Sequence, residues 1–218
     1  MLIVAKKIYA NINLGSLTPI FRFKIVIILT NWLFQGILYA DKTEKVFKIL
    51  LDLILATILS FFIIPFSNIY LGLLISLIIS HSILFMLNGQ LFALAKNFDI
   101  VYNDPQRIID YADGIKTRAC KEKSINCVVV YGSLVRGEIK PTSDLDVRVI
   151  RKSGILNGFR ACIFGLKERS KALSSRFPLD MYVIDSPKHL LKMRTDEIPV
   201  VLYDPNSILN KSLLNKCH

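Results

Sequence analysis

The longest feature of the hydrophobic pattern is a stretch of 43 residues, from Leu53 to Ala95, that contains no Asp, Glu, Lys or Arg. Its apolar positions do not follow the one-sided period of a soluble amphipathic helix. Two helices that cross a bilayer need roughly 20 residues each. A turn signal at residues 65–68, Pro-Phe-Ser-Asn, divides the stretch near its middle. The pattern therefore predicts two membrane-spanning helices, at about residues 49–64 and 69–91.

Lysines flank the outer ends of these two predicted spans. Lys42, Lys45 and Lys48 lie in a polar linker at residues 41–48, Lys96 follows the second span, and the turn between the spans has no basic residue. Short cytoplasmic segments of membrane proteins carry an excess of Lys and Arg. We therefore expect a multi-pass protein of the cell membrane, with the chain after the second span on the cytoplasmic side.

Residues 25–40 are also uncharged, but this segment is short and contains Trp32, Gln35 and Tyr39. Trp and Tyr side chains favour the head-group level of a membrane. The segment is either an interfacial or re-entrant helix or a tilted third span. Residues 1–96 as a whole are expected to form an all-α membrane region.

Two polar residues in the second predicted span, His81 and Asn88, are seven residues apart and so share a helix face. Ionisable residues inside a membrane are costly and are often functional. Alternatively, the two side chains form hydrogen bonds to another helix, for example to Thr57 or Ser60.

The composition becomes that of a soluble domain from about residue 97. A helix is predicted at residues 105–122, where apolar residues recur at helical spacing after the capping pair Asp104-Pro105. Further helices and strands alternate along the chain, and the strands are expected at residues 127–131, 145–150, 177–184 and 200–203. This order predicts a small α/β (α+β) domain at residues 97–205, with a mixed sheet and flanking helices, followed by a tail at residues 206–218.

The chain carries 28 Lys and Arg against 17 Asp and Glu, a net charge of +11. Such a surface attracts nucleic acid, nucleotides or anionic lipid head groups. No stripe of alternating aromatic and basic residues is evident, so we expect membrane lipid and nucleotide as partners rather than nucleic acid. The four cysteines have no paired spacing, which is typical of a reducing cytosolic setting.

The residues with the clearest chemistry lie between the first two predicted strands of this domain. Gly132-Ser133 turns the chain after an apolar strand, and the backbone of such a turn can hold an anion if the turn leads into a helix. Asp144 and Asp146 open the next strand, where residues two apart share a face about 6–7 Å apart. Two such carboxylates suit Mg²⁺ or Mn²⁺. Asp180, on a later strand, is the candidate for a third carboxylate.

This combination resembles the polymerase-beta-like nucleotidyltransferase superfamily, and its short spacing is most similar to the minimal nucleotidyltransferase branch. The resemblance covers about residues 99–205 and rests on Gly132-Ser133, Arg136-Gly137, Ser143-Asp144-Leu145-Asp146 and Asp180. It implies catalysis with two divalent ions held by Asp144, Asp146 and Asp180, and triphosphate contacts from Gly132, Ser133 and Arg136.

Arg148 lies on the same strand face as the two aspartates. It either contacts a phosphate as a further nucleotide-binding residue or is ion-paired or solvated.

Three functions fit these observations. The first is a membrane-anchored enzyme that moves NMP from ATP or another NTP to a membrane-associated acceptor, such as a surface-glycan precursor. The second is a regulator that nucleotidylates or restrains a protein partner, as minimal nucleotidyltransferases paired with toxins do. The third is an inactive nucleotide-binding membrane module. The intact aspartates argue against the third function, and the membrane anchor favours the first over the second.

Overall fold

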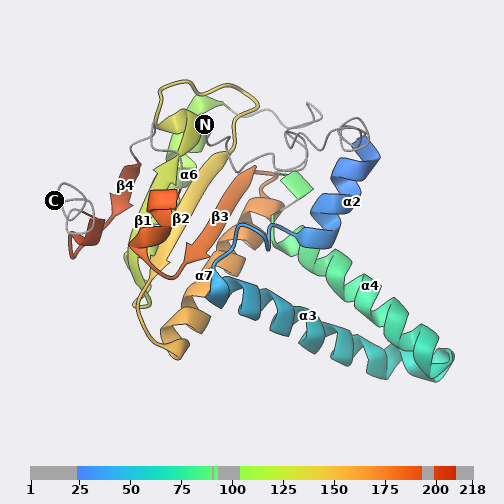
Figure 1. Ribbon diagram of the computed structural model, residues 1–218. Coiled ribbons are helices and arrows are strands. Elements are labelled where there is room, and N and C mark those ends of the chain that lie inside the picture. The colour runs from blue at the N-terminus through green and yellow to red at the C-terminus, as the bar shows by residue number, and fades with distance from the viewer. Residues whose placement is uncertain (1–23, 90, 93–103, 193–198, 210–218) are drawn as a thin grey trace.

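The computed structural model describes residues 24–89, 91–92, 104–192 and 199–209. These residues form a four-stranded sheet with two helices on one face and a helical hairpin that extends away from the sheet edge (Figure 1). The expectations for residues 1–23, for the start of the soluble domain before residue 104 and for the tail from residue 210 lie outside the described residues.

The sheet contains β1 (Ile125–Tyr131), β2 (Leu145–Arg151), β3 (Leu179–Ile184) and β4 (Val200–Tyr203) in the order β3-β2-β1-β4. β1 pairs in antiparallel fashion with β2 and β4, whereas β2 and β3 are parallel. The predicted mixed sheet is therefore confirmed. β3 is an edge strand and β2 is central, so Asp180 lies at the rim of the sheet and Asp146 lies inside it.

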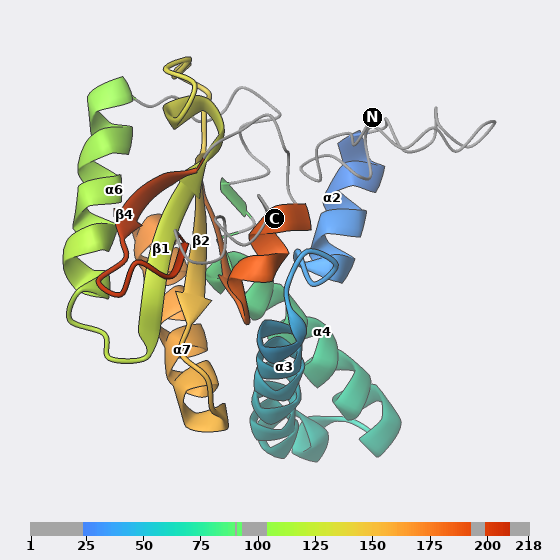
Figure 2. The ribbon, with the colours of Figure 1, turned by 60° about the vertical axis from the view of Figure 1, so that its left-hand side comes forward.

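Two helices, α6 (Pro105–Ala119) and α7 (Ile155–Ser174), cover one face of the sheet (Figure 2). Asp104 caps α6, since its carboxylate accepts a hydrogen bond from the backbone N–H of Gln106 at 3.0 Å. The side chains that α6 buries recur at the predicted helical spacing: Ile108, Ala112, Ile115 and Ala119. Short 3₁₀ helices, η6 (Gly132–Leu134) and η7 (Pro187–Lys192), complete the domain.

The N-terminal part of the described chain is helical, as predicted. It consists of α2 (Lys24–Phe34), α3 (Lys42–Ile63), the 3₁₀ turn η4 (Ile64–Phe66) and α4 (Ile69–Leu87). The predicted turn is present, and the side chain of Asn68 caps α4 by accepting a hydrogen bond from Leu71 N–H at 2.9 Å. Lys42–Phe66 and Ile69–Leu87 are both long and apolar enough to cross a membrane. Many of their large apolar side chains are exposed, Phe61 by 74% and Phe62 by 69%.

The predicted polar linker at residues 41–48 is not a linker, because α3 already begins at Lys42. We call residues 41–48 the helix base. Phe47 lies in the core of the sheet domain, where its ring packs edge-on against Phe159 with centroids 5.4 Å apart. Apolar packing therefore joins the start of α3 to α7.

Polar contacts fix the helix base to the outer edge of β3. The carboxylate of Glu44 is fully buried and accepts a hydrogen bond from Val183 N–H at 2.7 Å. It also forms ion pairs with Arg169 of α7, at 2.6 Å, and with Lys48, at 3.2 Å. The Asp41 carboxylate accepts a hydrogen bond from the N–H of Asp185 at 2.8 Å. Side chains of the helix base thus accept hydrogen bonds from backbone N–H groups at the edge of the sheet, which could otherwise pair with a strand of another chain.

The helix α2 has 11 described residues, a length of about 16 Å at 1.5 Å per residue. A bilayer core is about 30 Å thick, so the described residues of α2 span about half of it. Both views place α2 at the sheet end of the hairpin rather than alongside its full length (Figures 1 and 2). Both interpretations of residues 25–40, the interfacial helix and the third span, stay predictions.

Candidate functional site

The three predicted aspartates come together at one end of the sheet. Asp144 immediately precedes β2, Asp146 lies in β2, and Asp180 is its partner in the parallel register of β3. One carboxylate oxygen from each residue lies within 4.8 Å of the other two. Asp144 is 8% exposed and Asp146 is 4% exposed, while Asp180 is half-buried. Strand register therefore brings together residues that are up to 36 positions apart in the chain.

The chemistry of these donors fits a divalent cation. Carboxylate oxygens are the ligands of hard ions such as Mg²⁺ and Mn²⁺, and softer metals prefer nitrogen or sulfur. Three like charges in a partly buried site repel one another, and a cation between them relieves that repulsion. The cluster formed by Asp144, Asp146 and Asp180 is therefore a candidate metal centre.

The Gly-Ser turn lies directly against this cluster. Tyr131, the last residue of β1, is the register partner of Asp146, and Gly132 follows with a φ of +83°. A Cβ atom on Gly132 would lie 2.5 Å from Asp146 Oδ2, so only glycine allows the backbone to approach the carboxylate so closely. Ser133 follows at once and is half-buried. The turn continues into the three-residue 3₁₀ helix η6, not into an α-helix, so no helix N-terminus is available for an anion.

Arg136 is the exposed cation of this loop. Its Nε donates a hydrogen bond to Glu138 Oε2 at 3.3 Å, and the side chains of Arg136 and Glu138 are 39% and 67% exposed. An ion pair this exposed contributes about 0–1 kcal/mol. The predicted contact of Arg136 with a triphosphate is compatible with this position.

Arg148 is directed at the third aspartate. Its Nη1 donates a hydrogen bond to the backbone carbonyl of Asp180 at 3.1 Å, and its Nη2 lies 3.7 Å from Asp180 Oδ2. Burial lowers the pKa of Arg148, but the carboxylates of Asp180 and Asp146 outweigh burial and raise that pKa overall. The guanidinium stacks 4.8 Å from the ring centroid of Tyr182. Arg148 is therefore ion-paired in this structure, and its contact with a phosphate stays a prediction.

Residues from the expected membrane region also lie at the aspartate-bearing face of the sheet, and sequence patterns did not indicate them. Tyr182 is two positions after Asp180 in β3 and so shares its face. Its hydroxyl lies against Gly36, and its ring is 6.2 Å from the ring of Tyr39. Lys48 Nζ lies 5.3 Å from the same ring. The loop between α2 and α3 is thus a neighbour of the candidate metal centre, a placement that only long-range packing determines.

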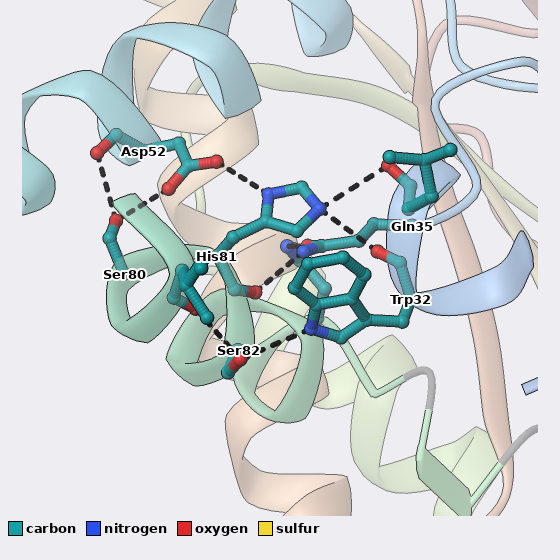
Figure 3. Close-up of polar contacts among 9 residues, drawn as sticks. Trp32, Gln35, Asp52, Ser80, His81 and Ser82 are labelled. Carbon is teal, nitrogen blue, oxygen red and sulfur yellow. Dashed lines mark hydrogen bonds and ion pairs between the residues drawn. The ribbon is translucent and has the colours of Figure 1, made fainter. Parts of the chain in front are cut away.

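A second polar cluster connects the three helices of the N-terminal region (Figure 3). His81 Nδ1 lies 2.6 Å from Asp52 Oδ2, and its Nε2 lies 2.9 Å from the backbone carbonyl of Trp32 at the end of α2. Ser80 donates a hydrogen bond to Asp52 Oδ1 at 2.5 Å. This arrangement favours the second interpretation of His81, hydrogen bonding to other helices.

The expected hydrogen-bond partners were wrong. Thr57 and Ser60 donate their hydroxyl groups to carbonyls of their own helix, at 2.8 and 2.7 Å. Asn88 instead donates a hydrogen bond to Gln35 Oε1 at 3.3 Å.

A comparison with protein families found a match for the central part of the chain. Residues 113–180 match the family model of the nucleotidyltransferase domain. The matched segment begins in α6, contains the Gly-Ser turn and ends at Asp180, so it includes the whole carboxylate cluster. The match supports the predicted superfamily, and the nucleotidyltransferase domain implies transfer of NMP from a nucleoside triphosphate, generally with a divalent metal. A comparison with curated proteins gave no match.

Proposed function

We propose that this protein is a membrane-anchored, metal-dependent nucleotidyltransferase that moves NMP from an NTP to an acceptor. The observation that carries this proposal is the convergence of Asp144, Asp146 and Asp180 within 4.8 Å, inside the matched domain and against the Gly-Ser turn. The intact carboxylates argue against an inactive nucleotide-binding module.

The residues of the site divide the chemistry between them. Asp144 and Asp146 would hold divalent ions, which supply charge neutralisation for the phosphates and the leaving pyrophosphate when bound. The Ser133 hydroxyl and the backbone at Gly132 would contact the β- and γ-phosphates. Asp180 would accept the proton of an acceptor hydroxyl, because its carboxylate is the one at the sheet rim. Preorganised charges of this kind usually stabilise the transition state more than any other single effect.

The hairpin of α3 and α4 supplies the anchor in this proposal. Its large apolar side chains are exposed along both helices, and a bilayer would cover them. The helix base carries lysines and the turn at Ser67 carries no basic residue, which supports a cytoplasmic position for the domain, where NTPs are available.

Asp146→Asn tests the metal centre, with Asp113→Asn on the exposed face of α6 as the matched control. Membranes containing each full-length variant are incubated with Mg²⁺ and each NTP labelled at the α-phosphate, and both transferred label and released pyrophosphate are measured. We expect Asp146→Asn to lower transfer at least about 100-fold, because an amide cannot replace a carboxylate ligand. Asp113→Asn should match wild type, and EDTA should abolish transfer until Mg²⁺ is restored. An Asp146→Asn variant that kept more than about a tenth of wild-type turnover would contradict the metal assignment.

A further inference from the structure

The two substrates of the proposed reaction must approach the carboxylate cluster from opposite sides. Nucleotidyl transfer is an in-line displacement, in which the acceptor oxygen attacks the α-phosphorus opposite the leaving pyrophosphate. The Gly-Ser turn, the proposed site of the β- and γ-phosphates, follows β1, whereas Asp180 belongs to β3, with β2 between them. Adjacent strands are about 4.8 Å apart, so the two sides are separated by roughly 10 Å. The acceptor side is therefore the β3 side, provided that the proposed function holds.

The β3 side is the part of the domain that the N-terminal region covers. The helix base is bonded to the outer edge of β3 through Glu44. The loop of residues 36–39 lies over the sheet face, with Gly36 and Tyr39 against Tyr182. Tyr182 and Asp180 are two residues apart on one strand face, about 6–7 Å. We call residues 36–39 the acceptor wall, because they pack on Tyr182, the neighbour of Asp180 on this strand face.

The acceptor wall is held by the helices of the hairpin. Gln35, the residue before the wall, donates a hydrogen bond from its side chain to the carbonyl of His81 at 2.6 Å. Its own carbonyl accepts a hydrogen bond from Lys48 Nζ at 3.2 Å. His81 is in turn bonded to Asp52 and to the end of α2 (Figure 3). Each of the three helices thus contributes to the position of the wall.

The helices that precede and follow the acceptor wall in the chain both expose apolar side chains. Ile25, Leu29 and Leu33 recur every fourth residue of α2, so they share one helix face, and they are 67%, 56% and 56% exposed. Leu50 and Leu53, in the part of α3 that follows the helix base, are 50% and 53% exposed. An exposed apolar helix face beside a polar cluster is the pattern of a helix at the membrane interface.

We propose that the acceptor is the head group of a membrane lipid, which reaches Asp180 at the rim of the sheet, on the side of β3 that carries the acceptor wall. A lipid presents its head group at the level of the interface, where α2 and the start of the hairpin place this approach. The reacting atom is a head-group oxygen, from either a hydroxyl or a phosphomonoester. It forms a bond to the α-phosphorus of the NTP, the bond from that phosphorus to the oxygen bridging to the β-phosphate breaks, and pyrophosphate leaves with the electron pair. Asp180 takes the proton of a hydroxyl acceptor, whereas a phosphomonoester dianion has no proton to lose.

The first test follows the label. Membranes containing the full-length protein, and matched membranes containing Asp146→Asn, are incubated with Mg²⁺ and NTPs labelled at the α-phosphate, and then separated into lipid, protein and aqueous fractions. We expect label that depends on Asp146 in the lipid fraction, where mass spectrometry distinguishes a phosphodiester from a phosphoanhydride. Label in protein or in a water-soluble product would overturn the lipid acceptor and leave the proposed function standing. No Asp146-dependent transfer into any fraction would overturn both.

The second test changes the acceptor wall. Tyr39→Ala removes a ring beside Tyr182, and Tyr70→Ala, 84% exposed at the far end of the hairpin, is the matched control. We expect Tyr39→Ala to lower transfer to lipid about 10- to 100-fold and to raise the lipid surface concentration needed for half-maximal rate, with NTP affinity unchanged. Tyr39→Phe, which keeps the ring, should retain transfer, and Tyr70→Ala should match wild type. Unchanged transfer in Tyr39→Ala, or an equal loss of NTP affinity, would place the acceptor elsewhere.

Discussion

Replacing Glu44 by alanine should destabilise the nucleotidyltransferase domain, although Glu44 belongs to the helix base. The substitution leaves Arg169, 1% exposed, and Lys48, 6% exposed, without the carboxylate that they share. It also removes the acceptor of the hydrogen bond from Val183 N–H. Removing one partner of a buried ion pair costs about 3–5 kcal/mol of unfolding free energy. Each increment of about 1.4 kcal/mol changes an equilibrium constant tenfold. The population of molecules in which the domain is unfolded should therefore rise roughly 100- to several-thousand-fold.

A buried thiol provides the assay. Cys162 lies in α7 within the domain core, and burial raises its pKa to about 12. A thiol of this kind reacts only when the domain opens, because the thiolate is the reactive form. The rate at which an alkylating reagent modifies Cys162 in the full-length protein, in detergent micelles, therefore measures the opening equilibrium. Cys120 is exposed and serves as an internal standard for the reagent.

The control for this experiment is a glutamate in an exposed ion pair. Glu138→Ala removes a side chain that is 67% exposed and 3.3 Å from Arg136, and such pairs contribute about 0–1 kcal/mol. Glu138→Ala should therefore change the labelling of Cys162 less than about fivefold. Combining Glu44→Ala with Arg169→Met should recover part of the loss, because the uncompensated guanidinium is then gone. An increase below about tenfold for Glu44→Ala would refute the conclusion that the helix base is part of the domain.

Two further predictions concern the Gly-Ser turn and the orientation of the hairpin. Gly132→Ala should lower both NMP transfer and Mn²⁺ affinity at least about tenfold, and electron paramagnetic resonance measures the affinity. The reason is that a φ of +83° costs alanine about 1–2 kcal/mol and that its Cβ atom would displace Asp146. Wild-type metal affinity in this variant would show that the close approach is unnecessary. In intact cells, an impermeant thiol reagent should label Ser67→Cys and should not reach the native exposed Cys120. Labelling of Cys120 from outside would reverse the orientation.

The order of elements in the soluble half was predictable because its signals are local. Alternating strand and helix patterns located all four strands to within a few residues, and the capping pair at Asp104 located the start of α6. The carboxylate pair Asp144 and Asp146 was also a local signal, and Asp180 followed from its position on a strand. Their approach to within 4.8 Å, in contrast, depends on the parallel register of β2 and β3, which no local pattern specifies.

The contacts of the helix base could not be predicted, because they join residues far apart in the chain. Glu44 lies among lysines in a segment that resembled a solvated linker, and its partner Arg169 is 125 residues away. His81 pairs with Asp52, the last charged residue before the uncharged stretch, and not with the hydroxyl groups inside that stretch. In each case a charged side chain at the margin of an apolar segment pairs with a side chain on another helix, and no local sequence pattern specifies that pairing.

The unbroken course of α3 from the sheet edge into the hairpin limits where the carboxylate cluster can lie relative to a bilayer. A domain on a flexible linker would sample many distances from the membrane surface and could reach acceptors at each of them. Here α3, a helix of 22 residues about 33 Å long, packs on the sheet domain with its first two turns and continues into the hairpin. With the hairpin in a bilayer, the carboxylates would travel only sideways, in a thin layer at constant height. Encounters between the carboxylate cluster and an acceptor would then depend on lateral diffusion in the membrane. An abundant acceptor group at another distance from the membrane would not be modified.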